Sequence, residues 1–233
     1  MFMNLAAFQS ATDQELIFQF QQIVDANAVS QNWVEMLYRP QTLMGHRNVE
    51  QFFKALNIQQ KVDLDIKIFS QIENILQSLK PNRLSVNLMP ISLLSPQFRD
   101  LLWQLIDYNI IDPKRICIEI VEIDSMPPLC SNAIKVLQHF KAKGGWLALD
   151  DFGSGFAHWE LLQMGLINVI KVASQNLKHF EHNQFTHGLA NFASSMNIQS
   201  VLEGVESKQD LVNGMNQGFD NFQGWYFDQA TSL

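Results

Sequence analysis

The segment Trp146-Leu-Ala-Leu-Asp-Asp151 decides the fold, because a short apolar run ends abruptly in two adjacent carboxylates. Such a run predicts a buried strand. Two segments of similar design flank it: RICIEIV (115–121) carries Glu119, and NVIKVA (168–173) carries Lys171. A charge on a strand that is buried on both faces is costly unless it is paired or bound to a metal ion. The pattern therefore predicts strands that deliver charged groups to one shared interior site.

Further strands and helices extend this pattern along the chain. The other predicted strands are IFQFQQIV (17–24), WVEMLYR (33–39), RLSVNLM (83–89), IQSVLEG (198–204) and FQGWYF (222–227). Segments with helical spacing lie between strands: VEQFFKAL (49–56), DIKIFSQIENILQSL (65–79), PQFRDLLWQLIDYN (96–109), NAIKVLQHFKAKG (132–144) and HGLANFASSM (187–196). The alternation predicts an α/β fold, a TIM-type (β/α)₈ barrel, although a doubly wound sheet gives a similar pattern.

Composition limits the domain organisation and the partners. The 233 residues are 47% hydrophobic and 17% charged, which is enough for a large core. Because no linker-like stretch divides the chain, we expect a tail over residues 1–12 and a single domain over residues 13–233. The net charge of -7 argues against DNA as a partner, but bound cations could still bring a phosphate substrate to the site.

The cysteines and the N-terminus bear on location. Cys117 lies in an apolar run, and neither it nor Cys130 forms a C-x-x-C pattern. This usage fits a reducing compartment. The N-terminal segment has no basic region before an apolar stretch, and no run of 18 uncharged apolar residues occurs. We therefore expect a cytoplasmic protein without a membrane span.

Polar side chains recur at the ends of the predicted strands. In a barrel these ends form the active-site face, so the side chains would converge. Carboxylate and amide oxygens suit Mg²⁺ or Mn²⁺, and adjacent aspartates could flank two ions roughly 4 Å apart. A lysine there could orient water or neutralise negative charge. The set is Glu35, Asn87, Glu119, Asp150, Asp151, Lys171, Glu203 and Gln223.

Each of these residues also has an ordinary structural explanation. A lone glutamate on a strand is more often a rim residue, Asp-Asp-Phe-Gly could be a common turn, and Asn87 could shape the chain before Pro90. What favours a functional site is the repetition of the same feature in strand after strand.

The chain resembles the EAL-domain family of cyclic di-GMP phosphodiesterases over nearly its whole length. EMLYR (35–39) resembles the E-A-L-x-R signature, and LDDFGSGF (149–156) resembles L-D-D-F-G-T-G-Y. The remaining landmarks follow the family's order: FQQIVD (20–25), SVNLMP (85–90), EIVE (119–122), IK (170–171), LEGVE (202–206) and QGWYF (223–227).

This resemblance implies a modified TIM barrel in which the first strand runs antiparallel to the others, and the early end of the chain implies a short or absent final helix. It also implies hydrolysis of cyclic di-GMP to linear pGpG. The metal ligands would be Glu35, Asn87, Glu119, Asp150, Asp151 and Glu203, with two ions of Mg²⁺ or Mn²⁺. Glu35, Lys171 and Glu203 would be catalytic, and Lys171 would hold the attacking water.

The resemblance implies other roles as well. Gln21, Arg39 and Gln223 would contact the substrate, and Glu122 would brace the loop that starts at Phe152. Such domains commonly form homodimers, so a homodimer is expected, and a separate regulatory protein could act on the chain.

Several residues depart from the family pattern, including Met36, Val121 and Ala173. They motivate a second hypothesis, in which a catalytically silent EAL-like domain serves as a cyclic di-GMP receptor or a protein-interaction module. A third candidate, a sugar-processing barrel with paired carboxylates, explains neither Asn87 nor the adjacent aspartates.

Overall fold

The computed structural model describes residues 16–40, 48–121, 128–153, 159–173 and 182–232. Its centre is a closed barrel in which β1 pairs with both β8 and β2. The barrel strands are β1 (Ile17–Asp25), β2 (Ser30–Arg39), β3 (Arg83–Leu88), β4 (Ile116–Ile120), β5 (Trp146–Leu149), β6 (Val169–Ala173), β7 (Gln199–Glu203) and β8 (Asn221–Phe222). Neighbouring strands from β2 to β8 are parallel, whereas β1 is antiparallel to both of its barrel neighbours. The predicted modified TIM barrel and its reversed first strand are confirmed.

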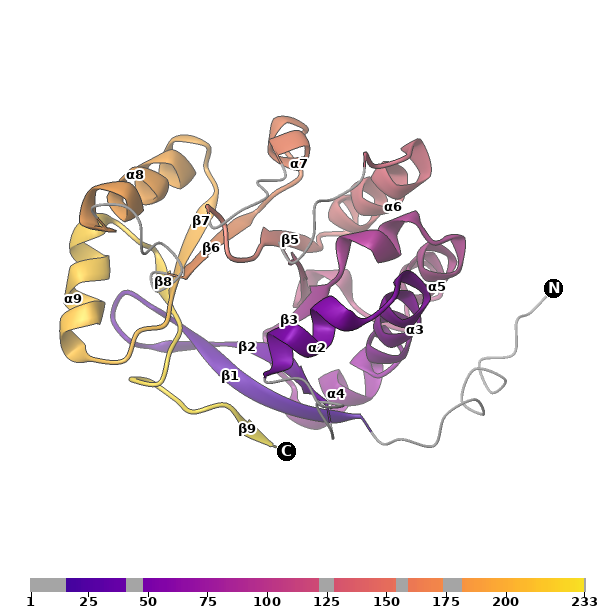
Figure 1. Ribbon diagram of the computed structural model, residues 1–233, viewed down its shortest axis with the longest axis horizontal. Coiled ribbons are helices and arrows are strands. Elements are labelled where there is room, and N and C mark those ends of the chain that lie inside the picture. The colour runs from indigo at the N-terminus through magenta and orange to yellow at the C-terminus, as the bar shows by residue number, and fades with distance from the viewer. Residues whose placement is uncertain (1–15, 41–47, 122–127, 154–158, 174–181, 233) are drawn as a thin grey trace.

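Helices cover two sides of the barrel, as Figure 1 shows. On one side are α2 (Val49–Ala55), α3 (Ile58–Phe69), α4 (Ile72–Leu79), α5 (Pro96–Asp107) and α6 (Ser131–Ala142). On the opposite side are α8 (His182–Ser195) and α9 (Lys208–Gln217), and the short α7 (Trp159–Gln163) lies between the two groups. The 3₁₀ turns η1 (Pro90–Leu94) and η2 (Pro113–Arg115) precede α5 and β4.

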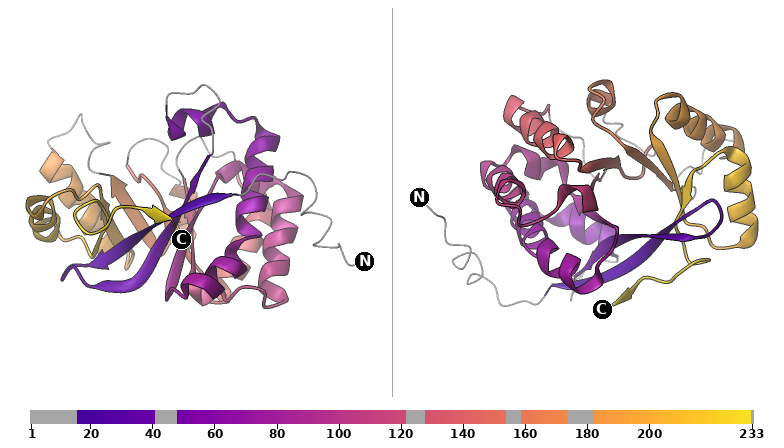
Figure 2. Two further views of the ribbon diagram at one scale, coloured as in Figure 1. Left: turned by 90° about the horizontal axis from the view of Figure 1, so that it is seen from below. Right: turned by 180° about the vertical axis from the view of Figure 1, so that it is seen from behind.

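The C-terminal end of the described chain carries no helix after β8. The short strand β9 (Thr231–Ser232) instead pairs antiparallel with Gln19 and Phe20 of β1, and Figure 2 shows it beside that strand. None of the helices in the described ranges combines the length and the apolar character needed to cross a membrane.

Two predicted elements were wrong in extent. The strand expected over 222–227 ends at Phe222, because the chain then folds onto Val205: a Cβ on Gly224 would lie 2.1 Å from the Val205 carbonyl oxygen, and Tyr226 donates its N–H to that oxygen. The helix expected over 65–79 is divided between α3 and α4. Ser70 turns its hydroxyl back onto the Ile66 carbonyl, and the Gln71 N–H bonds to Ile68 in a tighter turn.

Alternation along the strands separates the barrel wall from the barrel interior. Ile116, Ile118 and Ile120 of β4 face the large core beneath the helices. Cys117 faces inward, into a smaller apolar cluster that fills the lower part of the barrel: Ile23, Trp33, Cys117, Ala148, Val169 and Val201. We call these residues the apolar layer. Ser85 adjoins it, accepting a hydrogen bond from Trp33 Nε1 at 2.9 Å.

Candidate active site

A second layer of interior side chains lies directly above the apolar layer, and it is polar. Because side chains on one face of a strand recur every two residues, the next inward position on each parallel strand is two residues later. On the reversed strand β1 it is two residues earlier than Ile23. Counting two residues from each member of the apolar layer, and from Ser85, gives the polar layer: Gln21, Glu35, Asn87, Glu119, Asp150, Lys171 and Glu203. Strand period alone thus stacks a charged layer on an apolar one.

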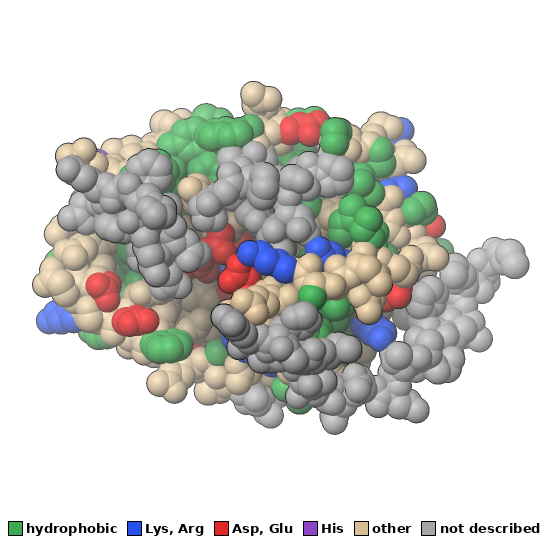
Figure 3. Space-filling view, viewed as in Figure 1, with side chains coloured by type: hydrophobic (Ala, Val, Ile, Leu, Met, Phe, Trp, Pro, Cys, Tyr) green, Lys and Arg blue, Asp and Glu red, His purple; other side chains and the backbone are tan. Residues whose placement is uncertain are grey.

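Lys171 is at the centre of the polar layer. Its Nζ lies 2.9 Å from Glu35 Oε2, 2.7 Å from Glu119 Oε2, 2.8 Å from Glu203 Oε1 and 3.5 Å from Asp150 Oδ1. Lys171 and Glu119 have no exposed surface. The space-filling view shows acidic side chains in a hollow near the middle of this face, with Lys and Arg side chains beside them (Figure 3). Carboxylates from four strands or strand ends therefore surround a single buried ammonium.

The charge state of Lys171 follows from this environment. Burial acts to lower the pKa of its ammonium, but the charges of Asp150, Glu119, Glu203 and Glu35 outweigh burial and raise it well above its ordinary value. Lys171 is therefore a permanent cation at neutral pH. In the protonated state it donates hydrogen bonds and neutralises negative charge.

The carboxylates of the polar layer differ in acidity. Burial acts to raise the pKa of Glu35, but Lys171 and the hydrogen bonds from Gln223 and Asn87 lower it below its ordinary value. Burial raises the pKa of Glu119 to about 8 and that of Asp150 to about 6, and the surrounding carboxylates add to the rise. The pKa of Glu203 is raised well above its ordinary value, again mainly by burial. One ammonium does not neutralise this many buried acids, so the layer favours additional positive charge.

Amide side chains connect the polar layer to the strand β1. Gln223, just after β8, donates from Nε2 to Glu35 Oε2 at 2.6 Å and is also 3.1 Å from Gln21 Oε1. Gln21 donates to the Asp228 carbonyl at 3.0 Å, and Asn87 donates to Glu35 Oε1 at 2.8 Å. With the bond from Lys171, Glu35 thus accepts three hydrogen bonds, more than any other carboxylate described in the layer.

The oxygen atoms of the polar layer are suited to binding divalent cations. Buried oxygens with no hydrogen-bond partner remain on Asn87 (Oδ1), Glu119 (Oε1), Asp150 (Oδ1) and Gln223 (Oε1). Buried acceptors are normally satisfied, and unpaired carboxylate and amide oxygens are the ligands that Mg²⁺ and Mn²⁺ prefer. Among the described residues, no three carboxylates are arranged to bind one ion, because Glu35, Glu119 and Glu203 are paired with Lys171. The fit therefore depends on the unpaired oxygens and on small movements of the side chains.

The structure describes two further predicted site residues, Arg39 and Asp151. Arg39 ends β2 on the same face as Glu35 and donates from Nε to Gln19 Oε1 at 2.8 Å. Asp151 follows Asp150 in a left-handed conformation, with a φ angle of 53°. Glu122, predicted to brace a loop, is outside the described residues.

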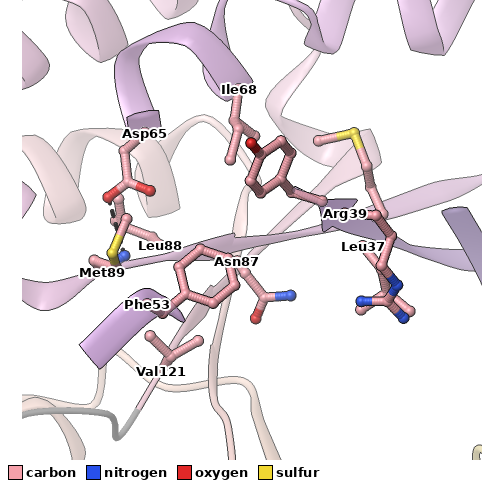
Figure 4. Close-up of a pocket in the computed structure, with 11 residues that line it drawn as sticks. Leu37, Arg39, Phe53, Asp65, Ile68, Asn87, Leu88, Met89 and Val121 are labelled. Carbon is pink, nitrogen blue, oxygen red and sulfur yellow. Dashed lines mark hydrogen bonds between the residues drawn. The ribbon is translucent and has the colours of Figure 1, made fainter. Parts of the chain in front are cut away.

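A pocket opens beside the polar layer; Asn87 belongs to both, and Arg39 also lines the pocket. Phe53, Met89 and Val121 supply apolar walls, and Figure 4 shows Asp65 and Arg39 on opposite sides of Asn87 and Phe53. The pocket thus combines an aromatic ring, a guanidinium and a buried carboxyl group within reach of the polar layer.

Asp65 is a residue that sequence reasoning missed. It lies on the buried face of α3 and is 1% exposed; its Oδ2 accepts the Met89 N–H at 3.1 Å and the Ser92 hydroxyl at 2.5 Å. Burial outweighs these hydrogen bonds and raises its pKa to about 8. The signal in the sequence was an aspartate between Val62, Ile66 and Phe69, on the apolar side of a helix.

Replacing Asp65 by Asn is expected to flatten the pH dependence of stability. The pKa of Asp65 is about 8 in the folded protein and 3.8 ordinarily. Its contribution to the free energy of unfolding is therefore fully present below pH 4 and is lost as the pH rises towards 8. Wild-type stability should therefore fall across this window relative to Asp65→Asn, by up to about 1.4 kcal/mol per pH unit. Urea unfolding at several pH values measures the difference. The control is Asp63→Asn, an exposed residue of the same helix, and parallel curves for wild type and Asp65→Asn would refute the prediction.

The fold and the site define a class of protein: a barrel of the TIM type whose strand ends carry buried acids and amides around a buried lysine. Within that class the chain belongs to the EAL domain family, whose family model matches residues 5–230.

Relatives and solved structures agree with this assignment. The chain is 25% identical over 243 residues to the probable cyclic di-GMP phosphodiesterase PdeA of Escherichia coli K12, covering 98% of this chain and 32% of that protein. It is 24% identical over 163 residues to the probable cyclic di-GMP phosphodiesterase PdeB of the same organism, covering 70% of this chain and 31% of that protein. The chain thus spans about a third of the length of these curated relatives.

Two solved structures share the fold. One is a standalone EAL protein from Vibrio cholerae O395 in its c-di-GMP-bound form, with a TM-score of 0.74, 23% identity, and coverage of 95% of this chain and 94% of that one. The other is Klebsiella pneumoniae BlrP1 in a manganese and cyclic di-GMP complex, with a TM-score of 0.75, 23% identity, and coverage of 95% and 57%.

Proposed function

We propose that this chain hydrolyses cyclic di-GMP to linear pGpG with the help of Mg²⁺ or Mn²⁺, two ions being bound per site. The observation that carries the proposal is the polar layer, in which buried oxygens of Asn87 and Glu119 have no hydrogen-bond partner. The names of the E. coli relatives and the ligand of the V. cholerae structure support the choice of cyclic di-GMP as substrate.

In the proposed reaction, a water oxygen attacks one phosphorus atom of the cyclic dinucleotide and the bond from that phosphorus to the 3′ oxygen breaks. The products are a 5′-phosphate and a free 3′-hydroxyl on a linear dinucleotide. Bound divalent ions would activate the water and neutralise charge on the phosphate and on the departing oxygen. The residues that would hold the ions are Glu35, Asn87, Glu119, Asp150, Asp151 and Glu203.

Lys171 would position the attacking water by donating to its oxygen. Its raised pKa supports this role, because a protonated ammonium is a donor throughout the physiological range. Glu203 contacts Lys171 at 2.8 Å and has a raised pKa of its own, which would allow it to exchange a proton with a nearby water. Gln223 would complete the site by holding Glu35 in place.

The pocket beside Asn87 would receive part of the substrate. The Arg39 guanidinium would contact a phosphate, for which its planar fork is well suited. A purine base would fit between the apolar walls of the pocket, with the Asp65 carboxyl group at its inner edge. Gln21, which bonds to Gln223, would close the opposite side of the site.

Incubation of cyclic di-GMP with the purified chain tests the proposal. Product chromatography should show linear pGpG with Mn²⁺ or Mg²⁺ present, and no product after treatment with a chelator. Readdition of either ion should restore turnover. If the folded chain gives no product with either ion, the proposed enzyme is ruled out.

A receptor for cyclic di-GMP is the second candidate function. The observation that favours it is that carboxylates of the polar layer are bonded to the Lys171 ammonium. Among the described residues, no three carboxylates are therefore arranged around an ion-binding position. Calorimetry separates the two functions: a receptor would bind cyclic di-GMP in the presence of Mg²⁺ and release it unchanged.

A further inference from the structure

The turn that carries the two adjacent aspartates has an unusual backbone. Asp151 and Gly153 are both left-handed, with φ angles of 53° and 92°, and Phe152 lies between them. The Phe152 N–H donates to the Lys171 carbonyl at 2.8 Å, which ties the turn to β6. A left-handed aspartate is energetically unfavourable compared with glycine, so this conformation needs support from its surroundings.

Phe152 supplies an anchor for the turn. Its ring is 2% exposed and stacks on Phe192 of α8, with ring centroids 6.1 Å apart and an interplanar angle of 10°. Trp159, the first residue of α7, meets Phe152 edge-on at 5.8 Å and Phe192 edge-on at 5.8 Å. We call Phe152, Trp159 and Phe192 the aromatic triangle.

The next residue of the turn also docks on α8. A Cβ placed on Gly153 would lie 3.2 Å from Leu189 Cδ1 and 3.4 Å from Phe185 Cε1. Phe152 and Gly153 therefore both rest against the same helix. The turn cannot relax its left-handed residues without pulling Phe152 out of the aromatic triangle.

We propose that Trp159 and Phe192 are positioning residues for the metal site, acting through Phe152 to hold Asp150 and Asp151 in place. In the described part of the chain, the ring contacts of Trp159 and Phe192 are with Phe152 and with each other. Their effect passes through one buried ring and one sharp turn to the two carboxylates that would bind the ions. Residues that orient metal ligands commonly change metal affinity 10- to 100-fold when they are replaced.

The exposure of Trp159 makes the proposal testable without loss of the fold. Trp159 is 52% exposed, so its replacement removes a half-buried surface side chain and leaves no closed cavity in the core. The matched control is Ile134, a partly buried residue of α6 that packs against the large core and is no member of the aromatic triangle. Phe192→Tyr keeps the ring of Phe192, whereas Phe192→Ala removes it.

The experiment titrates each variant with Mn²⁺ alone and counts free and bound ion by electron paramagnetic resonance. Trp159→Ala and Phe192→Ala should bind Mn²⁺ about tenfold more weakly than wild type. Phe192→Tyr should bind as wild type does, and Ile134→Ala should do the same. Circular dichroism at the titration temperature identifies the variants that are folded.

The outcomes separate this inference from the proposed function on which it rests. If wild type itself binds no Mn²⁺, the proposed metal site fails. If wild type binds but the folded Trp159→Ala variant binds equally well, the positioning role is overturned. An equal loss in Ile134→Ala would also overturn it, because general loosening of the barrel would then explain the effect.

Discussion

Glu35→Gln should lower the turnover of cyclic di-GMP roughly a thousandfold, the scale expected for loss of one preorganised electrostatic contact in an active site. Both oxygens of Glu35 accept hydrogen bonds: Oε1 from Asn87, and Oε2 from Lys171 and Gln223. A glutamine has one oxygen, so its amide nitrogen must face a donor on one side. The change also removes one negative charge from the proposed ion site.

The prediction is measured as the steady-state rate with Mn²⁺ at saturating substrate. Glu50→Gln is the matched control, because Glu50 lies on the surface in an ion pair with Lys54 and has the same side chain. The control should keep wild-type turnover. A folded Glu35→Gln variant with turnover within tenfold of wild type would contradict the role given to this residue.

Lys171→Met should be the most destabilising change in the polar layer when no divalent ion is present. Methionine fills a similar volume but leaves Glu35, Glu119 and Glu203 without their shared cation. Removing one partner of a buried ion pair typically costs about 3–5 kcal/mol. Added Mn²⁺ should restore part of this stability, because it would supply positive charge to the same oxygens.

Thermal unfolding with and without Mn²⁺ measures both effects, and turnover should be lost in either buffer. The control is Lys141→Met, which removes a partly buried lysine that donates to the Leu166 carbonyl and to Asn168 Oδ1. Its loss of stability should be smaller and should not respond to Mn²⁺. If Lys171→Met is as stable as wild type without metal, the electrostatic description of the layer is wrong.

The sequence allowed much of this site to be predicted because strand period is a local property. When a charged residue such as Glu119 or Lys171 lies within an apolar strand, the sequence indicates that it is buried. Its position in the two-residue strand period then indicates that it faces the barrel interior. The barrel then brings such residues together without further information. Gln21 entered the prediction through family resemblance, and its place in the layer became clear only from the reversed direction of β1.

Other parts of the site depend on contacts that no local pattern encodes. Asp65 is buried because α3 packs against η1, where Ser92 lies. Phe152, Trp159 and Phe192 come from separate elements, and their meeting is set by how α7 and α8 cover the barrel. The end of β8 is likewise fixed by the close approach of Gly224 to Val205, a contact between distant segments.

Hydrolysis of cyclic di-GMP in water enriched in oxygen-18 tests the central claim most directly. With Mn²⁺ present, mass spectrometry of the product should show linear pGpG that carries a single heavy oxygen in its terminal phosphate. This result would establish water as the attacking group at the proposed site. A folded chain that binds cyclic di-GMP with Mn²⁺ and returns it intact and unlabelled would contradict the claim.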